Sequence, residues 1–509
     1  MVTTIVPKVS GPFVGHVTTG HDAVPAVDAN PSAGLETATS GPLAQVSGEA
    51  HSRFVIVTTL LSLIDRVRGE PTTHSLDRHP HDDTWRQDQL QKKFLDSFAL
   101  ISSTSKKGGE TASAVCLEQG HPSGNILRLA RNRGIPQDLV FRLQEVLEDL
   151  TTVALRENKP KDLEDEILRK IIALTKDKVQ SLLQKLDRAE VRASIHHATD
   201  KISEDSLLDD TEDLNFKEWV RNLPLLVSTN SKWEPSELVS HIKWASRARW
   251  IYSEQLEMLF GFEDGKPPPW LKYIYKLGRY YAATKAMLKL AVKQPHIFTH
   301  IHIAPVKAPE PQSFSLGQQR TPLVTIVKKI TKADPGHLIE KLGQTWLTND
   351  PEERLRRACR MMLTVHAEMQ LLSFYDHNPH LTPRLLFMGT SKKACYLCHE
   401  FMSRHPLTIG VSASHQKLYP TWMPAPCSSA VRKRHKVLLW EFSRHLEQTT
   451  ARDLETRLGI QRRPFNLDST AGPSLTTTGT VSTGFWFQNL PLSIRDASEK
   501  ADSEGSDRE

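Results

Sequence analysis

The sequence predicts an α/β protein in which a mainly helical region, residues 51–292, precedes a region, 293–450, where strands and helices alternate. Between about residues 130 and 292, apolar residues recur every three or four positions, which is the period of a helix packed on one side. After Pro295 the period changes, and short apolar runs typical of strands lie between helix starts. Residues 1–50 and most of 451–509 lack such periodicity, so we expect them to be disordered.

The first region contains a series of predicted helices separated by polar segments. Pro136 fits the start of the first helix, because proline is favoured at the first helical position. The polar stretches around 102–125 and 204–213 are predicted to be loops. The apolar repeats predict helices over about 136–150, 163–186, 236–262 and 269–292.

The second region combines strand and helix signals. Asp334 and Asp350 each precede a proline, a pattern that caps and opens a helix. His300 and His302 share one face of the first predicted strand, where they are either a metal-binding pair or the more polar face of that strand. The predicted strands are 297–303, 323–330 and 384–389, and a last amphipathic helix is predicted over 429–447.

The composition restricts the class of protein. The 509 residues carry 65 Lys and Arg against 59 Asp and Glu, a net charge of +6 that permits contact with nucleic acid but argues against a histone-like protein. The longest apolar run, 54–64, is too short to cross a membrane. Five cysteines and no signal-like start predict an intracellular protein, cytoplasmic or nuclear, without a disulfide framework.

The residues that indicate chemistry lie between 364 and 427. His366 and Glu368 form a His-x-Glu motif, and Cys395 and Cys398 form a Cys-x-x-Cys motif. Each motif alone is weak, because a redox pair or half of a structural zinc site has the same cysteine spacing. The order of the two motifs, with an apolar strand between them, is much more specific.

The chemistry of these side chains fits one zinc ion. Cysteines three apart at a helix start lie on one face, so Cys395 and Cys398 can reach the same metal. His366 would be a third ligand, which leaves the fourth tetrahedral position for a water molecule, the pattern of a catalytic site. Zinc lowers the pKa of such a water, and Glu368 would take its proton and pass it to a substrate nitrogen.

Three segments resemble the OTT_1508-like deaminases, a branch of the zinc-dependent, cytidine deaminase-like superfamily found in many fungal proteins. The sequences of these segments are His366-Ala-Glu-Met-Gln-Leu-Leu, Gly389-Thr-Ser-Lys-Lys-Ala-Cys-Tyr-Leu-Cys398 and Ser414-His-Gln-Lys-Leu-Tyr-Pro-Thr-Trp422. The resemblance covers about 290–450 and implies a mixed sheet flanked by helices, with Zn²⁺ held between two helix N-termini. It assigns zinc binding to His366, Cys395 and Cys398 and proton transfer to Glu368. One departure is Ala394, where the superfamily usually has proline.

The resemblance also implies the reaction, which is hydrolytic loss of ammonia from a cytosine- or adenine-like base. The base would belong to a nucleic acid or to a free nucleoside or nucleotide. Residues that match the third segment or flank the cysteines are candidates for contact with the substrate: His415, Tyr419, Trp422 and Ser391. Tyr419 or Trp422 could stack on a base, although a packed loop is the favoured interpretation of both residues.

Two other classes of function stay open at this point. The first is a non-enzymatic adaptor with a structural zinc site, whose helical region binds protein partners and whose metal sphere is closed by His415 and Cys427. The second is a Cys-x-x-Cys thiol oxidoreductase that needs no zinc. The basic run 432–436 could contact phosphates, act as a nuclear import signal or be a solvated helix face. The sequence makes no prediction of the oligomeric state.

Overall fold

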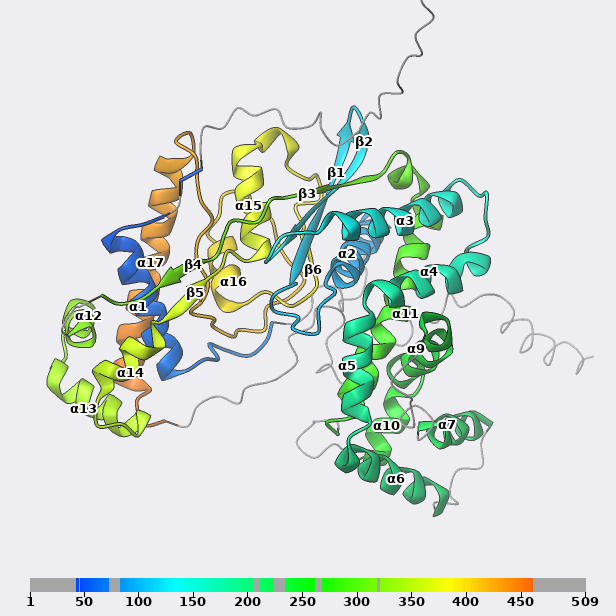
Figure 1. The fold of residues 1–509 in the computed structure, drawn as a ribbon, viewed down its shortest axis with the longest axis horizontal. Helices are drawn as coiled ribbons and strands as arrows, with labels where there is room; N and C mark the ends of the chain where they lie inside the picture. The colour runs from blue at the N-terminus through cyan, green and yellow to red at the C-terminus, as the bar shows by residue number, and fades with distance from the viewer. Residues whose placement is uncertain are drawn as a thin grey trace, which may run out of the picture. The chain divides into compact units, whose positions relative to one another are not determined.

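The computed structural model describes residues 43–44, 46–72, 83–204, 211–223, 234–260, 268–317 and 321–460. The predicted α/β class is confirmed, because a mixed sheet is packed between helices (Figure 1). Most of the two predicted disordered ends lies outside the described residues. Among the described helices, none combines the length and the hydropathy that a membrane span requires.

The central sheet has four strands. Its order is β3 (His302–Pro305), β2 (Gly124–Arg131), β1 (Ser113–His121) and β6 (Gly389–Thr390). β1 is antiparallel to both β2 and β6, whereas β2 and β3 are parallel. A separate antiparallel pair joins β4 (Gln312–Phe314) to β5 (Met361–Leu363).

The sheet separates two hydrophobic cores. Alternate residues of a strand point to opposite faces, so Val115 faces one core and Cys116 the other. Helix α2 (Asp83–Ser102) packs on β1 and β6, and α15 (Ala367–His377) packs on β1 and β2. Both strands of the hairpin are therefore almost entirely buried along their central residues.

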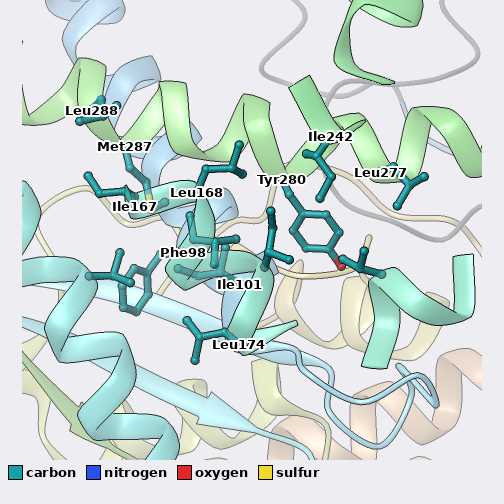
Figure 2. Packing of buried hydrophobic residues seen from close by; sticks show 14 of the residues in the cluster. Phe98, Ile101, Ile167, Leu168, Leu174, Ile242, Leu277, Tyr280, Met287 and Leu288 are labelled. Atoms are coloured by element: carbon teal, nitrogen blue, oxygen red, sulfur yellow. The ribbon is translucent and has the colours of Figure 1, made fainter. Parts of the chain in front are cut away.

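The first core is built mainly by helices. Around α2 it gathers α3 (Gln137–Ala154), α4 (Pro160–Leu174), α5 (Lys176–Leu186), α6 (Ala189–Glu204), α7 (Thr211–Arg221), α9 (Pro235–Trp250), α10 (Ser253–Phe260) and α11 (Leu271–Lys293). Figure 2 shows side chains of four of these helices directed toward one another, among them Phe98, Ile101, Ile167, Leu168, Ile242, Leu277, Tyr280 and Met287. The apolar stripes predicted from the sequence thus form one continuous core.

The second core lies on the other face of the sheet. It gathers α1 (Glu49–Ile64), α12 (Pro322–Ile330), α13 (Pro335–Trp346), α14 (Pro351–Ala358), α15, α16 (Tyr396–Met402) and α17 (Arg432–Thr456), with short 3₁₀ turns η3 (Pro295–Phe298) and η4 (Pro379–Leu381) elsewhere. α1 and α17 lie side by side although they are far apart in the sequence (Figure 1). An ion pair between Arg53 and Glu447 joins them.

Most of the predicted helices are confirmed, although two of them are divided and the last one, predicted over 429–447, runs from Arg432 to Thr456. The helix predicted over 163–186 is divided at Thr175 into α4 and α5, and the one over 236–262 is divided between Trp250 and Ser253 into α9 and α10. Asp334 and Asp350 cap α13 and α14 as predicted, because each carboxylate accepts a hydrogen bond from a first-turn backbone N–H.

Two secondary-structure predictions are wrong. Residues 323–330 form helix α12 and no strand, because Leu323, Ile326 and Val327 share a buried helical face. The Glu352 carboxylate accepts hydrogen bonds from the backbone N–H groups of Leu323 and Val324, which have no acceptor within the first turn of the helix. The stretch 102–125 was predicted to be a loop, yet it contains β1 and the turn of the hairpin.

Two predicted strands are much shorter than expected. His300 adopts a left-handed backbone conformation with φ of 52°, which interrupts the alternation predicted over 297–303, and the strand begins only at His302. In the run 384–389, Leu386 has a φ of 44°, and only Gly389 enters the sheet. The apolar character of both segments reflects burial in a core more than regular pairing.

We expect Gly389→Ala to destabilise the fold, because α2 passes directly over this strand. A Cβ atom at residue 389 would lie 2.2 Å from the carbonyl carbon of Leu95, which is backbone and cannot move aside cheaply. The free energy of unfolding should fall by about 3 kcal/mol in a urea titration, the upper range for overpacking. Gly410→Ala is the matched control, since nothing lies within 4 Å of its Cβ position. Equal stability of the two variants would contradict this packing.

Candidate functional site

Two helix starts bring the predicted metal ligands together. His366 is the N-cap residue of α15 and Cys395 is the N-cap residue of α16. The Cys395 sulfur accepts a hydrogen bond from the backbone N–H of Cys398 at 3.4 Å, which turns both cysteines toward the same point. The two helices therefore present one imidazole and two sulfurs to one place, although 29 and 32 positions separate the histidine from the cysteines.

The three donor atoms have the spacing of a tetrahedral metal site. Nδ1 of His366 lies 3.5 Å from the Cys395 sulfur and 3.4 Å from the Cys398 sulfur, and all three atoms are within 4.8 Å of one another. Tetrahedral zinc with ordinary Zn–S and Zn–N bonds sets sulfur and nitrogen about 3.5 Å apart. Within the described part of the chain, this is the one group of three such side chains close enough to hold a metal ion.

The charges of the donors also fit a cation. Burial raises the pKa of the Cys398 thiol, and the neighbouring Cys395 sulfur raises it further. Burial opposes ionisation of Cys395 as well, but the hydrogen bond from Cys398 and the His366 imidazole lower its pKa well below the ordinary value. Two thiolates can be ionised together in so small a buried space only when a positive ion compensates them.

Glu368 lies beside the donors without being one of them. It is in the first turn of α15, it is 8 % exposed, and it lines a cavity of about 330 Å³ together with His366 and Cys395. Burial raises the pKa of its carboxyl group, against the opposing effect of His366. A carboxyl group at the cavity wall next to a metal site can accept a proton and release it again.

The end of β2 holds the start of α15 in place. The backbone N–H of Ala367 donates to Oδ1 of Asn132 at 2.8 Å, and the Asn132 amide donates to the carbonyl of Gly109, also at 2.8 Å. Gln370 donates to the carbonyl of Arg131 at 3.2 Å. The hairpin thus fixes the position of His366. The sequence motifs gave no indication of this contact between the hairpin and α15.

Ser391 and Ala394 position the cysteines through backbone hydrogen bonds. The Ser391 hydroxyl accepts from the N–H of Ser113, and the Ser391 N–H donates to the carbonyl of Ser113, both at 2.9 Å. The N–H of Ala394 donates to the carbonyl of Ala413 at 2.9 Å. A proline at residue 394 could not make that bond, which gives a physical reason for an alanine at this position.

His415 and Tyr419, predicted to contact the substrate, both line the cavity. Their rings meet edge to face with centroids 5.7 Å apart. Burial and the surrounding cations, Lys417 foremost, lower the pKa of His415 to about 3, so its imidazole is neutral. Since its Nδ1 accepts the N–H of Lys417 at 3.0 Å, the proton is on Nε2.

Trp422 and Ser391 are not among the side chains that line the cavity. Trp422 is 0 % exposed and packs against Phe54, Phe401 and Phe442 in the second core. Its indole group lowers the pKa of Cys398 slightly, against the larger effect of burial. The rest of the cavity wall comes from Gly109, Glu110, Ala112, Asn132, Arg133, Met362, Thr364, Lys392, Lys393 and Thr421.

The other candidate ligands are elsewhere or outside the donor group. His415 and Cys427, which would close the metal sphere of an adaptor, are not part of the three-residue group found among the described residues. The backbone of Cys427 forms an isolated β-bridge with Ala44. His300 and His302 also form no such group there, and Nδ1 of His302 lies 3.4 Å from the His300 carbonyl oxygen.

The chain was compared with curated proteins, solved structures and models of protein families. No curated protein matches the chain, and no solved structure does. The resemblance inferred from the motifs is confirmed for the segment that contains His366, Glu368, Cys395 and Cys398: residues 365–426 match the model of the OTT_1508-like deaminase family.

Proposed function

We propose that the protein is a zinc-dependent hydrolytic deaminase of a cytosine- or adenine-like base. The observation that supports this most strongly is the group of three metal donors, two of which, His366 and Cys395, line the same cavity as the buried carboxyl group of Glu368. Three protein ligands are typical of catalytic zinc sites, which keep a coordination position for water, whereas structural sites have four. The match of residues 365–426 to a deaminase family supports the same reaction.

Metal binding and proton transfer would be carried out by different residues of the chain. His366, Cys395 and Cys398 would hold the ion, whose chemistry is to make water a nucleophile near neutral pH. Glu368 would accept a proton from that water and deliver it to the ring nitrogen, and it would then transfer the remaining proton of the added hydroxyl group to the leaving amine. The overall reaction consumes one water, replaces the exocyclic amino group by a carbonyl oxygen and releases ammonia.

The cavity wall suggests how a base would be held. The edge-to-face pair of His415 and Tyr419 offers an aromatic surface to a planar ring. With its proton on Nε2, the neutral His415 can donate a hydrogen bond to an acceptor on the substrate. These two residues would therefore orient the base, while the zinc ligands and Glu368 carry out the reaction.

Ammonia release from a panel of substrates tests this function. Full-length protein with bound zinc should release ammonia from at least one member of a panel of nucleosides, nucleotides, single-stranded DNA and single-stranded RNA. Release should stop when zinc is removed by a chelator and return when zinc is restored. Full zinc content without ammonia release from any base would favour the adaptor, and disulfide exchange by metal-free protein would favour the oxidoreductase.

A further inference from the structure

The cavity beside the metal donors has an unusual charge distribution. Three cationic side chains line it, Arg133, Lys392 and Lys393, against the carboxyl groups of Glu110 and Glu368. Glu368 is buried next to the metal ligands, where it is the proposed proton acceptor, and Glu110 is exposed. The side of the cavity formed by residues 392 and 393 is thus positive before any metal charge is added.

A third lysine, Lys178, lies near Lys392 although it does not line the cavity. The Cβ position of Gly108 is 3.3 Å from Nζ of Lys392 and 3.9 Å from Cε of Lys178, so both side chains converge on the same glycine. Nζ of Lys178 donates to the hydroxyl of Ser103 at 2.7 Å. Lys178 also belongs to the first turn of α5, where the helix dipole disfavours a cation.

Lys178 and Lys392 are surrounded by positive charge and have no acidic partner among the described residues. Burial, then Lys392 and Arg131, lower the pKa of Lys178 to about 7. Burial, then Lys276, lower the pKa of Lys392. In the described ranges, no carboxylate pairs with either ammonium group, and the charges that act on them are positive. Such a cluster costs stability in the free protein, and an anion bound in the cavity would remove that cost.

We infer that the substrate carries a phosphate, which Lys392 contacts at the cavity wall while the base lies at the metal donors. The inference rests on the proposed function. It restricts the substrate to nucleotides or nucleic acid and excludes free nucleosides. Lys392 lies three residues before Cys395, so a phosphate and a base of one nucleotide can be held by adjacent parts of one loop. In its charged form, Lys178 adds positive potential next to Lys392.

Binding to a protein that cannot turn over tests this inference. Full-length, zinc-loaded Glu368→Gln protein is titrated by calorimetry with cytidine, adenosine, their 5′-monophosphates, and short single-stranded DNA and RNA. At least one phosphate-bearing ligand should bind about tenfold or more tightly than its nucleoside. Lys392→Met should abolish most of that difference, and Lys392→Arg should keep it. Lys161→Met, an exposed lysine of α4, is the matched control and should change nothing.

The outcomes separate this inference from the proposed function. Preference for the monophosphates supports a free nucleotide, and preference for the oligonucleotides supports nucleic acid. Nucleosides that bind as tightly as phosphate-bearing ligands, equal effects of Lys392→Met and Lys161→Met, or no binding of any ligand would overturn it. Wild-type protein that deaminates nucleosides and nucleotides equally would overturn it and leave the proposed function standing. Phosphate-dependent binding without ammonia release would support the phosphate contact of Lys392 and contradict the proposed deaminase function.

Discussion

A Glu368→Gln protein is expected to fold and to bind its metal but to lose deamination. Glutamine has nearly the same shape, yet it cannot accept the proton that the buried carboxyl group at the cavity wall would take. Proton transfer by a positioned side chain contributes about 10²–10⁴-fold to a rate, so kcat should fall by that factor. The measurement is the rate of ammonia release, together with zinc content and the thermal midpoint of the same preparation.

Two comparisons make this result decisive. Glu340→Gln replaces an exposed carboxyl group of α13, so its rate should equal that of the unchanged protein. An adaptor predicts that Glu368→Gln has no effect on any property of the protein. Turnover by Glu368→Gln within a few-fold of the unchanged protein would therefore contradict a role of Glu368 in proton transfer.

A His366→Ala protein is expected to lose its metal. The imidazole nitrogen lies 3.5 Å and 3.4 Å from the two sulfurs, so its removal leaves only two of the three donors. Zinc content after dialysis should fall from about one ion per chain toward zero. The thermal midpoint should fall too, because two buried thiols lose the cation that favours their ionised form.

Cys427→Ala is the matched control for metal binding. This cysteine is a buried thiol of the same domain, but it is outside the group of donors found in the described residues. Its replacement should leave zinc content unchanged. A closed structural site predicts the opposite pattern, in which Cys427→Ala releases the ion.

The sequence predicted those parts of the fold that depend on local pattern. The caps at Asp334 and Asp350 and the apolar stripe of α11 are short-range signals, and the structure contains all three. The hairpin of β1 and β2 was missed, because its strands are buried on both faces and its first strand follows a polar stretch. The boundary near residue 292 stays a prediction, although two of the four strands lie before it. A protein partner for the helical region also stays a prediction.

In the site too, residues that belong to local motifs could be predicted, and residues that come together from distant parts of the chain could not. The motifs identified His366, Glu368, Cys395 and Cys398, because ligand chemistry restricts residue type and spacing within each helix start. Asn132 could not be found in this way. It is 235 positions from Ala367, and only the pairing of distant strands brings its side chain to the start of α15. Side-chain packing likewise decides that Tyr419 lines the cavity while Trp422 lies in the core.

X-ray absorption at the zinc edge of the purified full-length protein tests the metal site most directly. We predict a four-coordinate ion with two sulfur neighbours at about 2.3 Å and two nitrogen or oxygen neighbours at about 2.0 Å, one from His366 and one from water. The His366→Ala protein should lose this signal. A shell with three or four sulfur neighbours, or a spectrum that is unchanged in His366→Ala, would contradict a site built from one histidine, two cysteines and an open position.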